Sequence, residues 1–165
     1  MISPFIVKFD QLSLGKHEFA FKVDKTLFEG NGNEDVLDAS FDIKLELYKT
    51  GNVMDMKFLY SGDFILSCDR CNDAVTIPVK EESELIAKFG QLEHENLGEL
   101  IVLEDHEFEI DLGPYIYESL SLVIPVRHIH EEKDCNPEIL KKLKGIEEEN
   151  TSDYTDPRWQ KLKEL

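Results

Sequence analysis

Strict alternation of apolar and polar residues through the middle of the chain is the feature that most restricts its fold. Apolar side chains occupy every second position in four runs: Phe41, Ile43, Leu45 and Leu47; Met54, Met56, Phe58 and Tyr60; Phe64 and Leu66; and Val75, Ile77 and Val79. A period of two places such side chains on one face of a β-strand. Turn-forming residues interrupt the alternation at 49–52, 61–63 and 72–73. The pattern predicts an antiparallel meander with one buried face and one solvent-exposed face.

Weaker strand patterns lie on both sides of this meander. Further strands are predicted at 5–9, 18–23, 100–103 and 107–110. A helical turn is expected at 24–28, residues 80–89 continue the preceding strand or bend, and residues 90–98 are expected to form a loop.

Two helices are predicted in the last third of the chain. Asp111 is a suitable N-cap for a helix that ends before Pro125. The apolar stripe of this helix comprises Leu112, Tyr115, Ile116, Leu120 and Val123. A second, short helix is predicted to begin at Asn136-Pro137 and to end at Gly145.

The length of 165 residues suits one hydrophobic core. We expect an α+β fold with a predominantly antiparallel sheet of about six to eight strands, one packing helix, a zinc knuckle and a short helical C-terminal appendage. Residues 1–145 are predicted to form this single domain. Residues 146–155 are predicted to be an acidic linker, and 156–165 a helical motif that carries a tryptophan and basic residues. This motif either docks on the body or is a mobile segment that binds a partner.

The three cysteines indicate a metal site assembled from two distant segments. Cys68 and Cys71 form a C-x-x-C on the turn between two predicted strands, which is half of a tetrahedral zinc site. Cys135 lies far along the chain, with a histidine five residues before it. Three thiolates and one imidazole are typical of closed, structural zinc sites. The predicted zinc ligands are Cys68, Cys71, His130 and Cys135.

Three other roles for these cysteines remain open. A structural disulfide requires an oxidising compartment, but the first residues do not show the basic region and apolar run of a signal peptide, which favours a cytoplasmic protein. A thioredoxin-type redox pair needs its first cysteine at the start of a helix, whereas a turn and a strand follow Cys71. The thiols could also pack as small apolar groups without a metal.

The charge balance restricts the class of partner. The chain has 18 basic and 35 acidic side chains, for a formal net charge of −17. Nucleic-acid binders draw much of their affinity from Lys and Arg contacts to phosphate, so we do not expect this chain to bind naked RNA. The same field attracts basic proteins, although acidity can also serve solubility alone.

Several motifs together resemble those of a known family. They are Cys68-Asp69-Arg70-Cys71 on a hairpin, Asp111-Leu112-Gly113 before a helix, Ile124-Pro125 ahead of His130 and Cys135, and the ending 156–165. The chain resembles the large ribosomal RNA subunit accumulation protein family, also called YceD-like, over roughly residues 5–165. The resemblance implies a protein needed for normal levels of large-subunit ribosomal RNA, with no established enzymatic activity. Family members often carry a second proline where this chain has His128, so His128 stays an alternative to His130 as a ligand.

These observations predict a non-enzymatic factor in large-subunit ribosomal RNA accumulation or ribosome assembly. Its expected partner is a basic ribosomal protein or a large-subunit precursor particle. No association with a membrane is expected. Candidate contact residues are Arg70, Arg127, Arg158, Trp159, Lys161 and Lys163. No catalytic residues are predicted, because the charged run 104–106 is typical of an exposed turn. A zinc-dependent RNA-processing enzyme and an acidic chaperone-like module without a ribosomal role remain alternatives.

Overall fold

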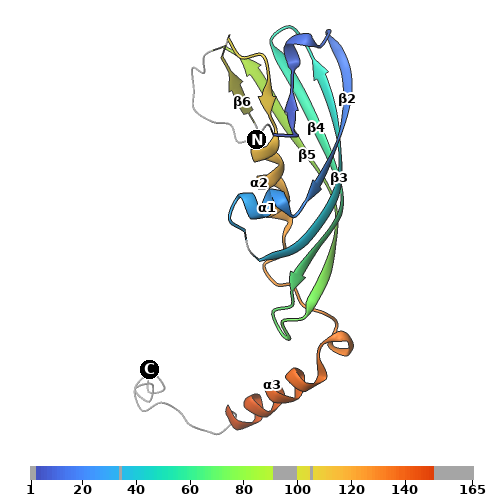
Figure 1. The fold of residues 1–165 in the computed structure, drawn as a ribbon, viewed down its shortest axis with the longest axis vertical. Helices are drawn as coiled ribbons and strands as arrows, with labels where there is room; N and C mark the ends of the chain where they lie inside the picture. Colours follow the sequence, from blue (N-terminus) through green and yellow to red (C-terminus); the bar gives the residue numbers. More distant parts are fainter. Residues whose placement is uncertain (1–2, 34, 91–99, 105, 151–165) are drawn as a thin grey trace, which may run out of the picture.

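The computed structural model describes residues 3–33, 35–90, 100–104 and 106–150. Most of the loop expected at 90–98 and the whole motif at 156–165 lie outside these residues. In the described part, seven strands form two sheets, and the helices are α1 (Thr26–Gly30), α2 (Gly113–Val123) and α3 (Pro137–Asn150), with short 3-10 turns at Phe9–Gln11 and Glu132–Asp134 (Figure 1).

The main sheet has five strands in the order β2-β3-β4-β5-β6. Four long neighbours are antiparallel, and β6 pairs in parallel with the end of β5. These strands are β2 (Gly15–Asp24), β3 (Val36–Lys49), β4 (Val53–Ser67), β5 (Ala74–Phe89) and β6 (Leu100–Leu103). β1 (Ile6–Val7) pairs with β7 (Ile110–Asp111) in a separate two-stranded sheet. The predicted α+β class with a mainly antiparallel sheet is confirmed.

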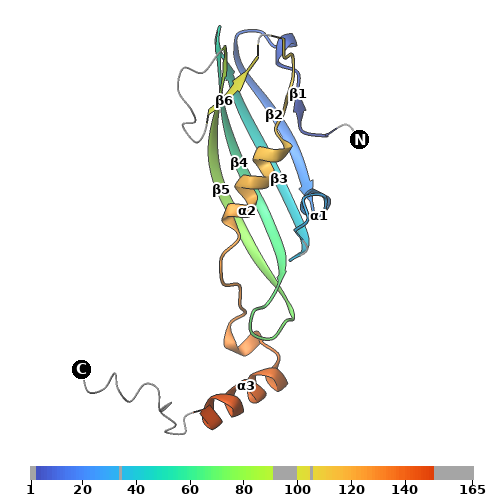
Figure 2. The ribbon, with the colours of Figure 1, turned by 90° about the vertical axis from the view of Figure 1, so that its left-hand side faces the viewer.

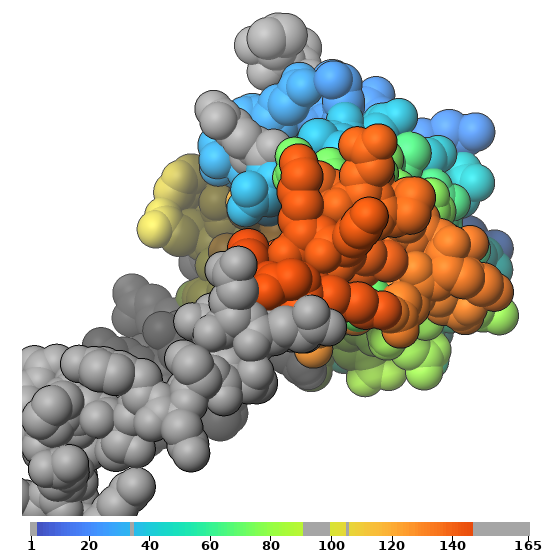
Figure 3. Space-filling view, turned by 90° about the horizontal axis from the view of Figure 1, so that it is seen from below, coloured from blue at the N-terminus to red at the C-terminus, as the bar shows by residue number. Residues whose placement is uncertain are grey.

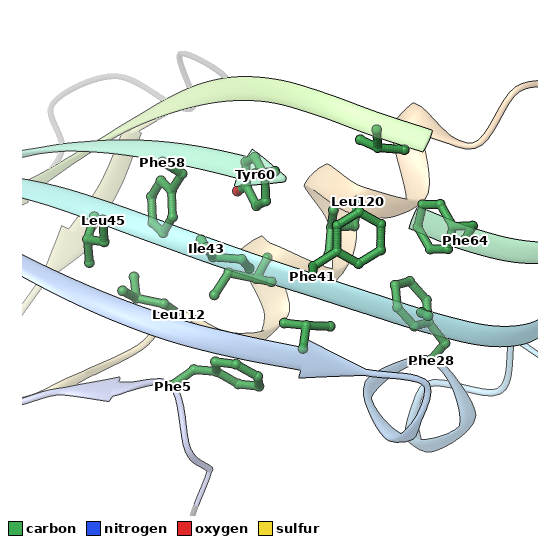
Figure 4. Close-up of a cluster of buried hydrophobic side chains, with 14 of the residues drawn as sticks. Phe5, Phe28, Phe41, Ile43, Leu45, Phe58, Tyr60, Phe64, Leu112 and Leu120 are labelled. Carbon is green, nitrogen blue, oxygen red and sulfur yellow. The ribbon is translucent and has the colours of Figure 1, made fainter. Parts of the chain in front are cut away.

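The hydrophobic core lies between one face of the main sheet and α2. Figure 2 shows α2 lying across this face, and α1 lies near the far end of β2. The apolar positions of the alternating runs point inward, where Phe41, Phe58 and Phe64 are almost fully buried (Figure 4). Leu112, Ile116 and Leu120 from the predicted stripe meet them and are fully buried, while Tyr115 and Val123 are partly buried. Burial of this face is the main stabilising contribution to the fold.

The predicted turn at 61–63 is wrong, because β4 continues through these residues without interruption. Gly62 pairs with Phe41 of β3, and a Cβ atom at Gly62 would collide with the Ser40 carbonyl oxygen and the Phe41 ring. The glycine therefore permits close approach of two strands rather than a change of chain direction. As a result β4 and β5 are long strands, and their connecting turn lies at the lower end of the sheet in Figure 1.

Three other boundaries differ from the sequence prediction. The strand expected at 5–9 is reduced to β1 at Ile6–Val7, and Phe9 begins a 3-10 turn. Residues 107–109 are not a strand, and β7 contains only Ile110 and Asp111. The helix expected to end at Gly145 continues to Asn150, so the predicted linker begins inside α3. Glycine within a helix costs only about 1 kcal/mol relative to alanine, so it is a weak stop signal without a C-cap conformation.

The start of α2 differs only in detail from its prediction. The helix begins at Gly113 rather than directly after Asp111. Asp111 still accepts the Gly113 N–H at 2.9 Å, and its Oδ1 also accepts the Ser3 hydroxyl at 2.8 Å. The carboxylate therefore satisfies a backbone donor at the helix N-terminus and ties the start of the chain to it.

Candidate metal centre

The turn between β4 and β5 brings the first two cysteines together. The Cys68 N–H donates to the Asp73 carbonyl at 2.8 Å, and the Asn72 N–H donates to the Cys68 carbonyl at 2.8 Å. Asn72 has a φ of 64°, a left-handed conformation that asparagine tolerates better than most residues. This compact turn holds Cys68 and Cys71 near each other, as metal binding by a C-x-x-C requires.

The second half of the cluster comes from the segment between α2 and α3. After α2 ends, this segment returns to the β4–β5 turn and then enters α3. Seen from below in Figure 3, the segment and α3 cover the lower end of the sheet. Cys135 immediately precedes Asn136, whose side chain accepts the Glu138 N–H at 3.1 Å and so caps α3. The cap sets the point at which the chain leaves the cluster.

All four predicted ligands meet in one cluster. The ligand atoms of Cys68, Cys71, His130 and Cys135 lie within 4.8 Å of one another. The His130 Nδ1 atom is 3.4 Å from the Cys71 Sγ atom and 3.8 Å from the Cys135 Sγ atom. Neighbouring ligand atoms in a tetrahedral zinc site are about 3.4–3.8 Å apart. The three cysteines are buried and free, so the cluster has the size and the donor atoms to hold a metal ion.

A backbone carbonyl determines which nitrogen of His130 faces the sulfur atoms. The His130 Nε2 atom is 2.9 Å from the Ala74 carbonyl oxygen. Because a carbonyl only accepts, Nε2 carries the hydrogen, and the lone pair of Nδ1 is directed toward the thiols in the neutral ring. Metal-bound histidines are commonly oriented by such a partner on the second nitrogen. Ala74 therefore prepares His130 to act as a ligand.

His128, the alternative ligand, belongs to a different contact. Its Nε2 atom is 3.4 Å from the Asp69 carboxylate, and its Nδ1 atom is 3.3 Å from the Pro125 carbonyl oxygen. The His128 N–H donates to Asp69 at 2.8 Å, and the Asp69 N–H donates to the His128 carbonyl at 2.9 Å. These bonds attach the segment between α2 and α3 to the β4–β5 turn. The geometry thus favours His130 as the ligand and gives His128 a structural role.

Three of the four predicted ligands have shifted pKa values in the metal-free protein, and the shifts differ in direction. Burial disfavours a thiolate at Cys68, but N–H groups of Cys71, His130 and Arg70 outweigh it and lower the pKa to about 6. The hydrogen bond to Ala74, opposed by burial and aided by the thiols, raises the pKa of His130 to about 9. Burial, then the neighbouring Cys71 and Cys68, raise the pKa of Cys135 to about 11. A metal ion therefore has to displace protons from His130 and Cys135.

The remaining candidate residues are not brought together. The Arg70 Nη1 atom lies 3.8 Å from the Cys135 Sγ atom, beside the cluster, whereas Arg127 is exposed. Arg158, Trp159, Lys161 and Lys163 lie outside the described residues. His106 contacts Glu104 at 3.2 Å on the surface, with both side chains more than 70% exposed (79% and 73%). Sequence reasoning missed the roles of Asp69 and of the Ala74 carbonyl, because neither has a signal beyond its proximity to the cysteines.

The part of the chain that contains both halves of the cluster matches a family model. Residues 56–165, two thirds of the chain, match the model described as large ribosomal RNA subunit accumulation protein YceD. The chain belongs to the YceD family. The match begins inside β4, although β2 and β3 complete the same sheet. No curated protein and no solved structure matches the chain significantly.

Membership of the YceD family implies a part in the accumulation of large-subunit ribosomal RNA. The family description names no class of enzyme. Among the described residues, no helix is long and apolar enough to cross a membrane.

Proposed function

We propose that this YceD protein is a non-enzymatic factor that supports large-subunit ribosomal RNA accumulation by binding a basic ribosomal protein or a large-subunit precursor particle. The family match over residues 56–165 carries the proposal, because it spans the two segments that form the metal centre as well as α3. The protein binds its partner before or during subunit assembly, and loss of the partner complex lowers the level of the ribosomal RNA.

The surface charge supports a basic partner. A net charge of −17 repels the phosphates of free RNA and attracts a cationic protein over long range. On the outer face of the main sheet, Lys16 and Lys44 bridge Glu18 and Glu46, so these two acids are neutralised locally.

A binding role also agrees with the polar groups of the described residues. Apart from the three thiols of the cluster and Tyr60, no polar or charged side chain in the described part of the chain is buried. A general acid or base usually works in a cleft that shifts its pKa, whereas His106 and Glu104 are exposed on the surface. These features support recognition over catalysis as the basis of activity.

The metal centre is part of the same proposal. Three thiolates and one imidazole form a complete tetrahedral set for zinc, which leaves no position for a substrate. Zinc at this site would join the β4–β5 turn to the segment that leads into α3. Its role is structural, as it fixes the shape of the lower end of the molecule.

A depletion experiment tests the proposed function. We expect depletion of the protein to reduce large-subunit ribosomal RNA relative to small-subunit ribosomal RNA, and tagged protein to co-sediment with large-subunit precursors. A normal level of large-subunit ribosomal RNA after depletion would contradict a ribosomal role. It would favour the alternative of an acidic chaperone-like module. Cleavage of precursor RNA by the purified zinc-loaded protein would instead support an RNA-processing enzyme.

A further inference from the structure

We propose that Arg70 is a positioning residue of the metal centre, which stabilises the metal-bound cluster by placing its guanidinium charge beside the Cys135 sulfur. This inference rests on the proposed metal site. Arg70 occupies one of the two positions between the C-x-x-C cysteines, and its Nη1 atom lies 3.8 Å from the Cys135 Sγ atom. A residue of the first half-site thus contacts a ligand from the second half-site.

The charge of the ligand set calls for such a partner. Three thiolates and a divalent cation leave one net negative charge, on sulfur atoms that are largely removed from water. That charge lies in a protein that is already strongly acidic. A guanidinium donating an N–H to sulfur compensates the excess charge where solvent cannot do so, and such outer contacts tune metal sites.

The surroundings of Arg70 leave its charge available to the cluster. Among the described residues, no carboxylate lies within ion-pair distance of Arg70, although the sequence is rich in acids. Glu132 is the acidic side chain whose pKa Arg70 helps to lower, but the hydrogen bond and charge of Lys144 contribute more. The Lys144 ammonium binds Glu132 at 2.8 Å. Glu132 therefore has its own cation. Among the described residues, Arg70 makes its only side-chain hydrogen bond to Cys135.

Arginine suits this position better than lysine. Its planar guanidinium carries several N–H donors in a fixed arrangement and is weakly hydrated, so it can remain beside a buried sulfur. A lysine ammonium at position 70 would keep the charge, but it has fewer N–H donors than a guanidinium and is more strongly hydrated. The substitutions Arg70→Gln and Arg70→Lys therefore separate the contribution of charge from that of geometry.

The test measures the affinity of the full-length protein for zinc by competition with a chromophoric chelator. We expect Arg70→Gln to weaken zinc binding by about 10–100-fold, as for other outer contacts of metal ligands, and Arg70→Lys to weaken it less. The control is Lys133→Gln, which removes the same charge two residues from Cys135. Lys133 pairs with Glu131 at 2.7 Å on the surface, so its loss should leave zinc affinity close to that of the wild type.

A second readout guards against an effect on folding alone. With Co²⁺ in place of zinc, the sulfur-to-metal charge-transfer bands of Arg70→Gln should shift from those of the wild type while circular dichroism shows an intact sheet. Equal zinc affinity for wild type and Arg70→Gln would overturn this inference, as would an equal loss in Lys133→Gln. Failure of the wild type to bind zinc would instead contradict the proposed metal site.

Discussion

At the scale of single residues, the metal centre depends on groups that prepare the ligands as well as on the ligands themselves. Ala74 orients His130, Asp69 fastens the returning segment, and Arg70 lies beside Cys135. Each contact joins the β4–β5 hairpin to the segment after α2. The two half-sites are thus held together by hydrogen bonds in addition to any metal ion, which reduces the ordering needed when a metal binds.

Replacing one ligand should release the metal and destabilise the fold. We expect Cys68→Ser to lose its zinc and to lower the free energy of unfolding by several kcal/mol, because the binding energy of a structural metal contributes to folding. Metal content and urea unfolding measure the two effects. Ser67→Ala, at the neighbouring position, is the control and should retain both metal and stability. A Cys68→Ser protein with full metal content would exclude Cys68 as a ligand.

Metal binding should release protons at neutral pH. Cys68, with its pKa lowered to about 6, is already largely a thiolate at pH 7, whereas His130 and Cys135, with pKa values raised to about 9 and about 11, hold their protons. Zinc binding therefore displaces protons, and its affinity rises as the pH increases from 6 toward 9. Calorimetry at pH 7 in buffers of different ionisation enthalpy measures the release. A binding heat independent of the buffer would contradict this protonation pattern.

At the scale of elements, two long strands carry the Cys68–Cys71 turn beyond the end of α2. β4 and β5 extend as a hairpin past the end of α2, so the cluster lies at one end of the sheet. The uninterrupted course of β4 through residue 62 makes this possible, because a turn there would place the cysteines elsewhere. Gly62 therefore contributes to the position of the metal centre without contacting it.

A side chain at residue 62 should destabilise the sheet. In Gly62→Ala the added Cβ collides with the backbone of β3, which cannot move without disturbing its pairing with β2. We expect the free energy of unfolding to fall by about 1–3 kcal/mol, the usual cost of overpacking, as measured by urea denaturation. Gly51→Ala is the matched control, because no atom lies within 4 Å of a Cβ there and its φ is not positive. Equal stability of both variants would show that β3 and β4 adjust freely.

Helix α3 should depend on the metal centre for its attachment. It follows directly after Cys135, and of its first turns only Ile139 and Leu140 pack partly against the core. The surface pair of Glu132 and Lys144 adds little. We expect a chelator to speed amide hydrogen exchange across residues 125–146 while β2 to β4 stay protected, as measured by mass spectrometry. Unchanged exchange in α3 would mean that packing alone holds it.

At the scale of the whole molecule, the buried apolar side chains of the described residues form one continuous core. The buried apolar side chains come from residues 5–135, and partly buried ones extend this cluster to residue 140. The C-terminal motif at 156–165 adds aromatic and basic side chains to a strongly acidic chain. We propose that this motif contacts a partner inside a ribosomal precursor particle, where a tryptophan can stack and basic groups can meet phosphate.

Removal of residues 156–165 should separate binding from folding. We expect the melting temperature to remain that of the full chain and co-sedimentation with large-subunit precursors to be lost, because a recognition motif contacts the partner and not the core. Trp159→Ala tests the same motif in a chain of full length. A lower melting temperature after truncation would show instead that the motif packs on the body.

The sequence alone predicts most of the strands and the ligand types, because both follow from local order. A period of two defines the buried face of a strand whatever its neighbour, and Cys68, Cys71 and Cys135 are the only thiols in the chain. Two features of the site depend on contacts between distant segments, which only the three-dimensional structure shows. Which histidine faces the thiols depends on the Ala74 carbonyl, and whether Gly62 turns or pairs depends on Ser40 of the adjacent strand. Both partners are distant along the chain, so no local pattern could reveal them.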